Sequence, residues 1–189
     1  MTDISRESVT NSLNKLYDYI ETKNISSGTT THIYQKECDI EHRSVLLSLI
    51  YNNDIEKLLL KDHKPGDYSI EPVTSMNEIY CGKHRGTGIN SAGSDAVFET
   101  LHIDGPFGLI PFLTLYRCIL TICNETGTET IIKDKCFKMK KGEIAVIDYN
   151  RDMHFIRTQE PPPPDAKRYV LKLHYVKYPK WMPGVLISC

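Results

Sequence analysis

The stretch FLTLYRCILTIC, from Phe112 to Cys123, is rich in the Ile, Thr, Tyr and Phe residues that are typical of a β-strand. Seven other short runs of similar character follow the turn signal Lys64-Pro65-Gly66-Asp67 and are separated by Gly and Asn. These runs are Ile79 to Cys81, Val97 to Ile103, Thr128 to Ile132, Cys136 to Met139, Ile144 to Tyr149, His154 to Thr158 and Arg168 to Val176. Many short strands of this kind predict an antiparallel sandwich or barrel.

The first third of the chain has helical periodicity instead. Apolar side chains recur at helical spacing from Val9 to Ile20, and two more apolar clusters lie on either side of Asn52-Asn53-Asp54, a sequence well suited to capping a helix. We therefore predict an α+β, mainly β fold in a single domain, residues 1–189. Residues 1–66 are expected to be mainly helical support, and residues 67–189 are expected to form a jelly-roll core, a double-stranded β-helix.

The composition is that of an ordinary globular protein and excludes several classes. Lys and Arg number 23 against 24 Asp and Glu, so the net charge of -1 provides no general attraction for nucleic acid. Apolar runs are far shorter than the roughly 20 residues that a membrane span needs. The polar first residues do not resemble a secretory signal, and none of the six cysteines forms a CxxC pair. We expect a cytoplasmic protein with free thiols.

His102, Asp104 and His154 form the candidate metal site. His102 and Asp104 are two positions apart, which places both side chains on one face of a strand. His154 follows 50 residues later (154 minus 104), beyond several predicted strands. Two neutral imidazoles and one carboxylate leave coordination positions of Fe(II) open, as non-haem oxygenases require. The alternative is that the three residues are incidental, because an HxD triplet often occurs by chance.

Further blocks follow in a regular order along the C-terminal half. They are Leu101-His102-Ile103-Asp104, Tyr116 to Glu125, Thr128-Glu129-Thr130, Gly142 to Asp148, Met153-His154 and Arg168 to Leu171. This order resembles the iron- and 2-oxoglutarate-dependent oxygenase superfamily, nearest to its prolyl 4-hydroxylase-like branch. Two features depart from that pattern: the segment Gly127-Thr128-Glu129-Thr130 is not an intact Gly-Gly-Glu-Thr block, and His154 to Arg168 spans 14 positions (168 minus 154), which is long for the branch.

The resemblance implies that Arg168 binds the distal carboxylate of 2-oxoglutarate, because a guanidinium can donate two charge-assisted hydrogen bonds. If the Pro-rich loop does not absorb the extra spacing, Lys167 or Lys172 takes this role. Tyr116 or Arg117 is the candidate for a second contact, and neighbours on a strand point to opposite faces. Strict alternation places Arg168 on one face with Val170, Lys172 and His174, and puts on the other face an apolar set: Tyr169, Leu171, Leu173 and Tyr175.

The implied function is a dioxygenase that uses Fe(II) and the cosubstrate 2-oxoglutarate. It would hydroxylate a peptidyl or free amino acid, with proline as the first compound to test, and release succinate and carbon dioxide; ascorbate is an additional cofactor to test. Its partners would be this small-molecule cosubstrate and a peptide, protein or amino-acid substrate, with no membrane. Two alternatives stay open: a cupin-like metal-dependent enzyme that does not use 2-oxoglutarate, and a non-catalytic jelly-roll binding module.

Overall fold

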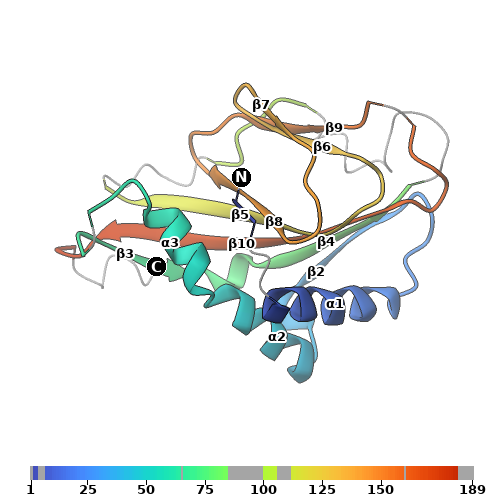
Figure 1. Cartoon of the computed structure of the whole chain (residues 1–189), viewed down its shortest axis with the longest axis horizontal. Helices are drawn as coiled ribbons and strands as arrows, with labels where there is room; N and C mark the ends of the chain where they lie inside the picture. The colour runs from blue at the N-terminus through green and yellow to red at the C-terminus, as the bar shows by residue number, and fades with distance from the viewer. Residues whose placement is uncertain are drawn as a thin grey trace.

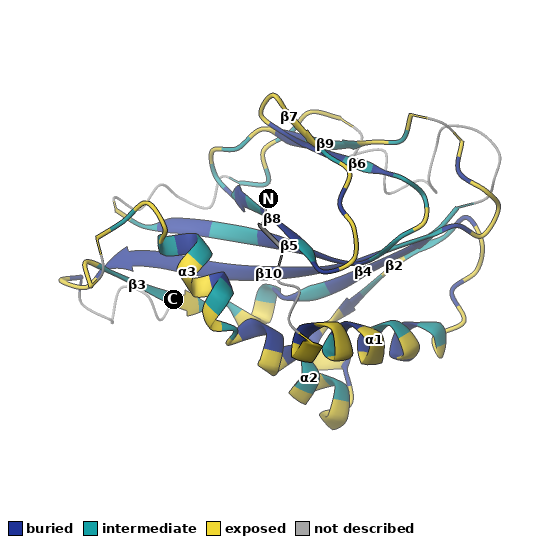
Figure 2. Ribbon diagram, viewed as in Figure 1, coloured by how far each residue is buried: buried dark blue, intermediate teal, exposed yellow. Residues whose placement is uncertain are grey.

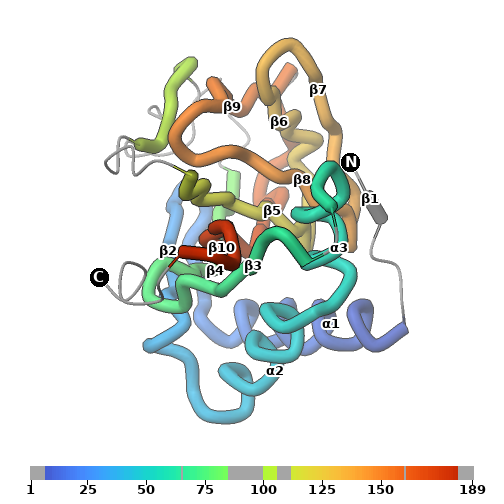
Figure 3. The backbone as a smooth tube through the Cα atoms, turned by 90° about the vertical axis from the view of Figure 1, so that its left-hand side faces the viewer, coloured from blue at the N-terminus to red at the C-terminus, as the bar shows by residue number. Residues whose placement is uncertain are grey.

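Two antiparallel β-sheets and a layer of helices make up the molecule. The computed structural model describes residues 2–3, 7–64, 66–84, 100–105, 112–159 and 161–182. The smaller sheet lies over one face of the larger sheet, and the helices α1 and α2 lie below its other face (Figures 1 and 3). This arrangement confirms the prediction of an α+β, mainly β fold.

The larger sheet has seven strands within the described residues, in the order β1-β8-β5-β10-β4-β2, with β3 also paired to β10. Its strands are β1 (Thr2–Asp3), β2 (Thr30–Tyr34), β3 (Tyr68–Pro72), β4 (Glu78–Lys83), β5 (Thr114–Asn124), β8 (Glu143–Asp148) and β10 (Lys167–Pro179). The predicted strand from Phe112 to Cys123 corresponds to β5. This strand pairs with β10 from Thr114 opposite Lys177 to Asn124 opposite Arg168. β10 is therefore the central strand of this sheet, because β3, β4 and β5 all pair with it.

The smaller sheet has the order β7-β6-β9 within the described chain. Its strands are β6 (Glu129–Ile132), β7 (Lys135–Phe137) and β9 (His154–Arg157). A single antiparallel bridge between His102 and His154 adds the segment 100–105 to the free edge of β9. Residues 97–99 of the predicted strand from Val97 to Ile103 lie outside the described residues, and in its described part, 100–103, only His102 pairs.

The N-terminal third is mainly helical, as predicted. It contains α1 (Glu7–Glu21), α2 (Ile40–Ile50), α3 (Asn53–Leu60) and a short 3-10 helix, η1 (Gln35–Glu37). A second 3-10 helix, η2 (Thr74–Met76), follows just after this region. The Asn52 side chain caps α3 by accepting a hydrogen bond from the Asp54 amide at 2.8 Å. β2 was not predicted in this region: it is a strand at the end of the sheet order and pairs with β4. In the part of the chain that is described, no helix is long and apolar enough to span a membrane.

The main hydrophobic core lies between the helices and the larger sheet. Buried apolar residues of α1, such as Leu13 and Leu16, belong to the same cluster as the apolar face of β10. That face consists of Tyr169, Leu171, Leu173 and Tyr175, as alternation predicted. Figure 2 shows that β10 is buried along most of its length, because its other face is covered by the smaller sheet. β10 thus separates the packed core from the space between the sheets.

Replacing Leu16 by Ala tests this core. The Leu16 side chain is 0% exposed, so the change leaves a cavity and should lower the free energy of unfolding by about 2–5 kcal/mol. Leu47→Ala on α2 is the matched control, because Leu47 is 37% exposed and should cost well under half as much. Urea unfolding followed by circular dichroism measures both. Equal losses in the two variants would contradict the packing of α1 against the sheet.

Candidate metal centre

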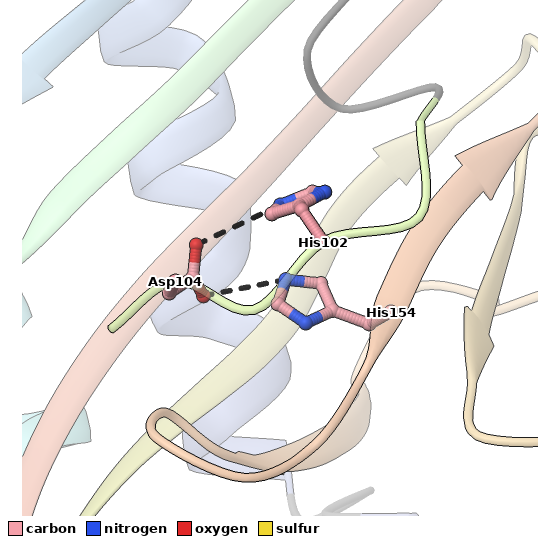
Figure 4. Close-up of side chains that lie close together, drawn as sticks. All are labelled: His102, Asp104 and His154. Atoms are coloured by element: carbon pink, nitrogen blue, oxygen red, sulfur yellow. Dashed lines mark ion pairs between the residues drawn. The ribbon is translucent and has the colours of Figure 1, made fainter. Parts of the chain in front are cut away.

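His102, Asp104 and His154 lie together at one site between the sheets. Their ligand atoms are all within 4.8 Å of one another. His102 Nε2 lies 3.7 Å from Asp104 Oδ1, and His154 Nε2 lies 3.3 Å from Asp104 Oδ2 (Figure 4). The three residues that the sequence singled out are therefore neighbours in space.

The backbone bridge between His102 and His154 produces this arrangement. The His102 amide donates to the His154 carbonyl at 3.1 Å, and the His154 amide donates to the His102 carbonyl at 2.9 Å. Residues directly opposite each other in an antiparallel pair project to the same face. The two imidazole rings accordingly lie with centroids 4.4 Å apart, and Asp104 follows two positions later on the same side.

Hydrogen bonds at Nδ1 define which tautomer each neutral imidazole adopts. His102 Nδ1 lies 2.7 Å from the Thr100 carbonyl oxygen, and His154 Nδ1 lies 3.0 Å from the Asp152 carbonyl oxygen. Because a carbonyl only accepts, each Nδ1 carries the hydrogen, and the neutral ring has its lone pair on Nε2. Metal-binding histidines commonly donate their second nitrogen to a carbonyl in this way. Both Nε2 atoms are thus ready to bind an ion beside Asp104.

Asp104 is held as a carboxylate. Arg117 NH1 donates to Asp104 Oδ2 at 2.6 Å, and the two side chains are 11% and 10% exposed. Burial opposes the charged form, but the charged surroundings, with the guanidinium of Arg117 among them, outweigh it and lower the pKa of Asp104 below its usual value. The acid is therefore ionised at neutral pH, as a metal ligand must be.

The donor set fits a reactive ion better than a structural one. Structural zinc sites normally have four protein ligands, whereas this group has three among the residues that the structure describes. It is the one group of three or more His, Cys, Asp or Glu ligand atoms found within the described residues. Two imidazole nitrogens and one carboxylate suit a non-haem Fe(II) ion with open coordination positions.

A cavity with about 420 Å³ of empty space, part of it open to solvent, is lined by two of the three residues, His102 and His154. Its lining combines apolar side chains with three cations, and consists of Tyr80, His102, Arg117, Ile119, Thr130, His154, Phe155, Ile156, Arg168, Val170 and Lys172. Arg168, Val170 and Lys172 all come from one face of β10, as alternation along this strand predicted. The cavity is thus suited to a small anionic ligand with an apolar middle.

Two of these cations lie near Tyr80. The Arg168 Cζ atom is 5.5 Å and Lys172 Nζ is 5.3 Å from the centre of the Tyr80 ring. Lys172 also donates to Glu78 at 2.7 Å. Burial lowers the pKa of Lys172 although Glu78 opposes this shift. Burial also opposes the charged form of Glu78 and so raises its pKa. The contacts with His32 and Lys172 outweigh this effect and bring the pKa of Glu78 down to about 2.

Two predicted cosubstrate residues lie elsewhere. Lys167 points to the helical side of β10, where Nζ donates to Glu21 at 2.6 Å and to the Tyr17 hydroxyl at 3.0 Å. Tyr116 packs against the main core, and its hydroxyl accepts a hydrogen bond from a lysine near the end of β10 at 3.0 Å. The prediction that either contacts a cosubstrate does not fit these positions, because adjacent strand residues face opposite ways. Their neighbours along the chain, Arg117 and Arg168, line the cavity instead.

Sequence reasoning missed Tyr80, Glu78 and His32 as surroundings of the site. His32 had no partner at ligand spacing along the sequence, yet its Nδ1 lies 3.0 Å from Glu78 Oε2 across the β2–β4 pair. The available signal was the two-residue spacing between Tyr80, on the predicted strand Ile79 to Cys81, and Glu78 just before that strand. It could not be used without the pairing of β4 with β10, which places Tyr80 opposite Val170.

Comparisons with known proteins do not assign the chain to a family. A scan against protein-family models finds no match, and a search of curated proteins finds none either. The resemblance to iron- and 2-oxoglutarate-dependent oxygenases stays a prediction.

Metal titration tests the site directly. We expect the metal-stripped protein to bind one Mn(II) per chain, measured by isothermal titration calorimetry. Removing a ligand in His154→Ala should reduce the affinity by at least roughly 100-fold. His42→Ala is the control, since His42 pairs with Asp39 on α2 and belongs to no ligand group. Unchanged Mn(II) binding by His154→Ala would rule out this site.

Proposed function

We propose that the chain is an Fe(II)- and 2-oxoglutarate-dependent oxygenase built on a double-stranded β-helix. The observation that carries the proposal is the convergence of His102, Asp104 and His154 beside a cavity lined by basic side chains. Three ligands with open positions suit an iron oxygenase, and the adjoining cations suit a dicarboxylate.

The order of the strands supports the jelly-roll part of this proposal. From β4 to β10 the chain alternates between sheets: β4 lies in the larger sheet, the segment 100–105 in the smaller, β5 in the larger, β6 and β7 in the smaller, β8 in the larger, β9 in the smaller and β10 in the larger. These are seven strands and one bridged segment, matching the eight strands and two facing sheets of a jelly roll.

The residues at the site fit the proposed iron. His102 and His154 would bind it through Nε2, because their Nδ1 atoms donate to carbonyl groups, and Asp104 would add one negative charge. When bound, Fe(II) supplies the oxygen chemistry that no amino-acid side chain provides. The protein's own contribution is to hold these three ligands on one side and leave the cavity side open.

The cavity also fits the proposed cosubstrate. Arg168 would bind the distal carboxylate of 2-oxoglutarate, while Ile119 and Val170 provide an apolar surface for the carbon chain between the two acidic ends. Lys172 contributes positive charge deeper in the pocket, although Glu78 compensates much of it.

The proposed reaction is hydroxylation of a peptidyl or free amino acid, with release of succinate and carbon dioxide. The apolar lining around His154, including Phe155 and Ile156, would exclude water from the reacting centre. Proline is the first substrate to test. A cupin-like enzyme without 2-oxoglutarate and a non-catalytic binding module remain as outcomes that the experiment below distinguishes.

Turnover assays test the reaction. With Fe(II) present, we expect oxygen consumption and succinate formation that require 2-oxoglutarate, and we expect His102→Ala and Asp104→Ala to abolish both. The assay is run with and without proline or prolyl peptides, and the control is Arg151→Gln, which removes an exposed ion pair to Asp148. Turnover without 2-oxoglutarate would favour the cupin-like enzyme. No stoichiometric metal binding would favour the binding module.

The anchor of the cosubstrate is tested by its affinity for Mn(II)-loaded protein. Arg168→Ala removes charge-assisted hydrogen bonds worth about 1.5–3 kcal/mol, so the dissociation constant should rise roughly 10- to 100-fold. Lys167→Ala is the matched control and should change nothing, because this neighbour bonds to Glu21 on the opposite face. If Lys172→Met weakens binding and Arg168→Ala does not, Lys172 is the anchor.

A further inference from the structure

Arg117 connects the candidate metal ligand Asp104 to a buried histidine on the central strand. Its NH1 donates to Asp104 Oδ2 at 2.6 Å, and its Nε donates to His174 Nε2 at 3.0 Å. The guanidinium also lies 4.7 Å from the centre of the Tyr149 ring. Three separate contacts therefore fix the orientation of a side chain that is 11% exposed.

His174 is suited to act as a fixed acceptor. It is 1% exposed, and burial together with the charge of Arg117 lowers its pKa to about 3, so the ring is neutral. Because Nε2 accepts from Arg117, the ring hydrogen lies on Nδ1. The backbone amide of His174 donates to the buried Asn77 side chain at 2.8 Å, which ties this part of β10 to the loop before β4.

We propose that Arg117, oriented by His174, is a positioning residue that restricts Asp104 to binding the ion through one oxygen, Oδ1. This inference rests on the proposed metal site and cosubstrate. Arg117 acts through Asp104 and not on the substrate. Its effect is to preserve a coordination position that the cosubstrate needs.

The chemistry of the carboxylate supports this role. A carboxylate can bind a metal ion through one oxygen or through both. Asp104 Oδ2 already accepts a short charge-assisted bond, and the guanidinium next to it repels a cation that approaches this oxygen. Without Arg117, Oδ2 is available to the ion as well. Asp104 would then occupy a position that a chelating ligand or oxygen requires.

The charge of Arg117 acts in the same direction. Two neutral histidines and one carboxylate leave a bound divalent ion with net positive charge, and the nearby guanidinium adds to it. This local field favours an anionic chelating ligand over water. Loss of Arg117 should therefore weaken binding of the cosubstrate through both effects, while binding of the metal ion is maintained or strengthened.

The experiment separates binding of the ion from binding of the cosubstrate. Arg117→Met keeps a long side chain but removes the charge and the donors. We expect calorimetry to show Mn(II) affinity equal to or greater than that of the wild type, with 2-oxoglutarate affinity lower by at least about tenfold. X-ray absorption of the Co(II)-loaded variant should show the short metal–carbon distance of a carboxylate that binds through both oxygens, because the second Asp104 oxygen replaces a bound water. Arg157→Met is the control, because it removes a comparable Arg–Glu129 pair on the exposed side of β9.

A second variant guards against misfolding of the first. His174→Phe keeps a ring but removes the acceptor for Arg117 Nε, so it should shift both affinities in the same directions by a smaller factor. Arg117→Lys keeps the charge and should restore part of the cosubstrate affinity. A purely structural role would instead weaken binding of the ion and of the cosubstrate together and would leave the metal–carbon distance of the carboxylate unchanged.

The outcomes distinguish this inference from the proposed function. If Arg117→Met binds 2-oxoglutarate as well as the wild type, or loses Mn(II) and 2-oxoglutarate equally, the positioning role is wrong and the oxygenase proposal stands. If the wild type binds Mn(II) but not 2-oxoglutarate, the proposed cosubstrate is wrong, and the X-ray absorption comparison alone decides the role of Arg117. A wild type that binds no divalent ion overturns both.

Discussion

The pair of backbone hydrogen bonds between His102 and His154 is the interaction on which the candidate site depends. It joins the segment 100–105 to the edge of β9 and places two imidazoles on one face, although the residues are distant in the sequence. A register shift by one residue would turn one ring to the other side, because strand side chains alternate. The order of the sheet and the chemistry of the site are thus linked through one antiparallel bridge.

The two faces of β10 have different roles. Its face with Tyr169 and Leu171 packs into the core under the helices, and its face with Arg168 and Lys172 lines the cavity. Substitutions on the first face should act mainly on the free energy of unfolding, and those on the second mainly on ligand binding. The contacts of Lys167 with the helix α1 show how one step along the strand changes the role of a basic residue completely.

The alternation of side chains along a strand was sufficient to predict that His102 and Asp104 share a face and which residues lie on each face of β10. This alternation depends on local backbone geometry alone. It could not tell whether Tyr116 or Arg117 faces the cavity, since that depends on the pairing of β5 with β10 and β8. β2 was missed because Thr30–Tyr34 lies at the edge of the sheet, with one buried residue in its pattern. Likewise, the bonds from Arg117 to Asp104 and His174 join residues whose proximity is set by the fold.

The buried charges beside the cavity support binding of an anion. Removing charged groups from water costs free energy that an ion pair only partly recovers, so a buried pair is a weak source of stability. Yet Arg117 pairs with Asp104, and Lys172 pairs with Glu78, and both cations line the same cavity. Apolar residues of similar volume often stabilise a fold as well as a buried pair does. The placement of these two cations beside the candidate metal ligands therefore supports the proposal of a ligand that carries negative charge.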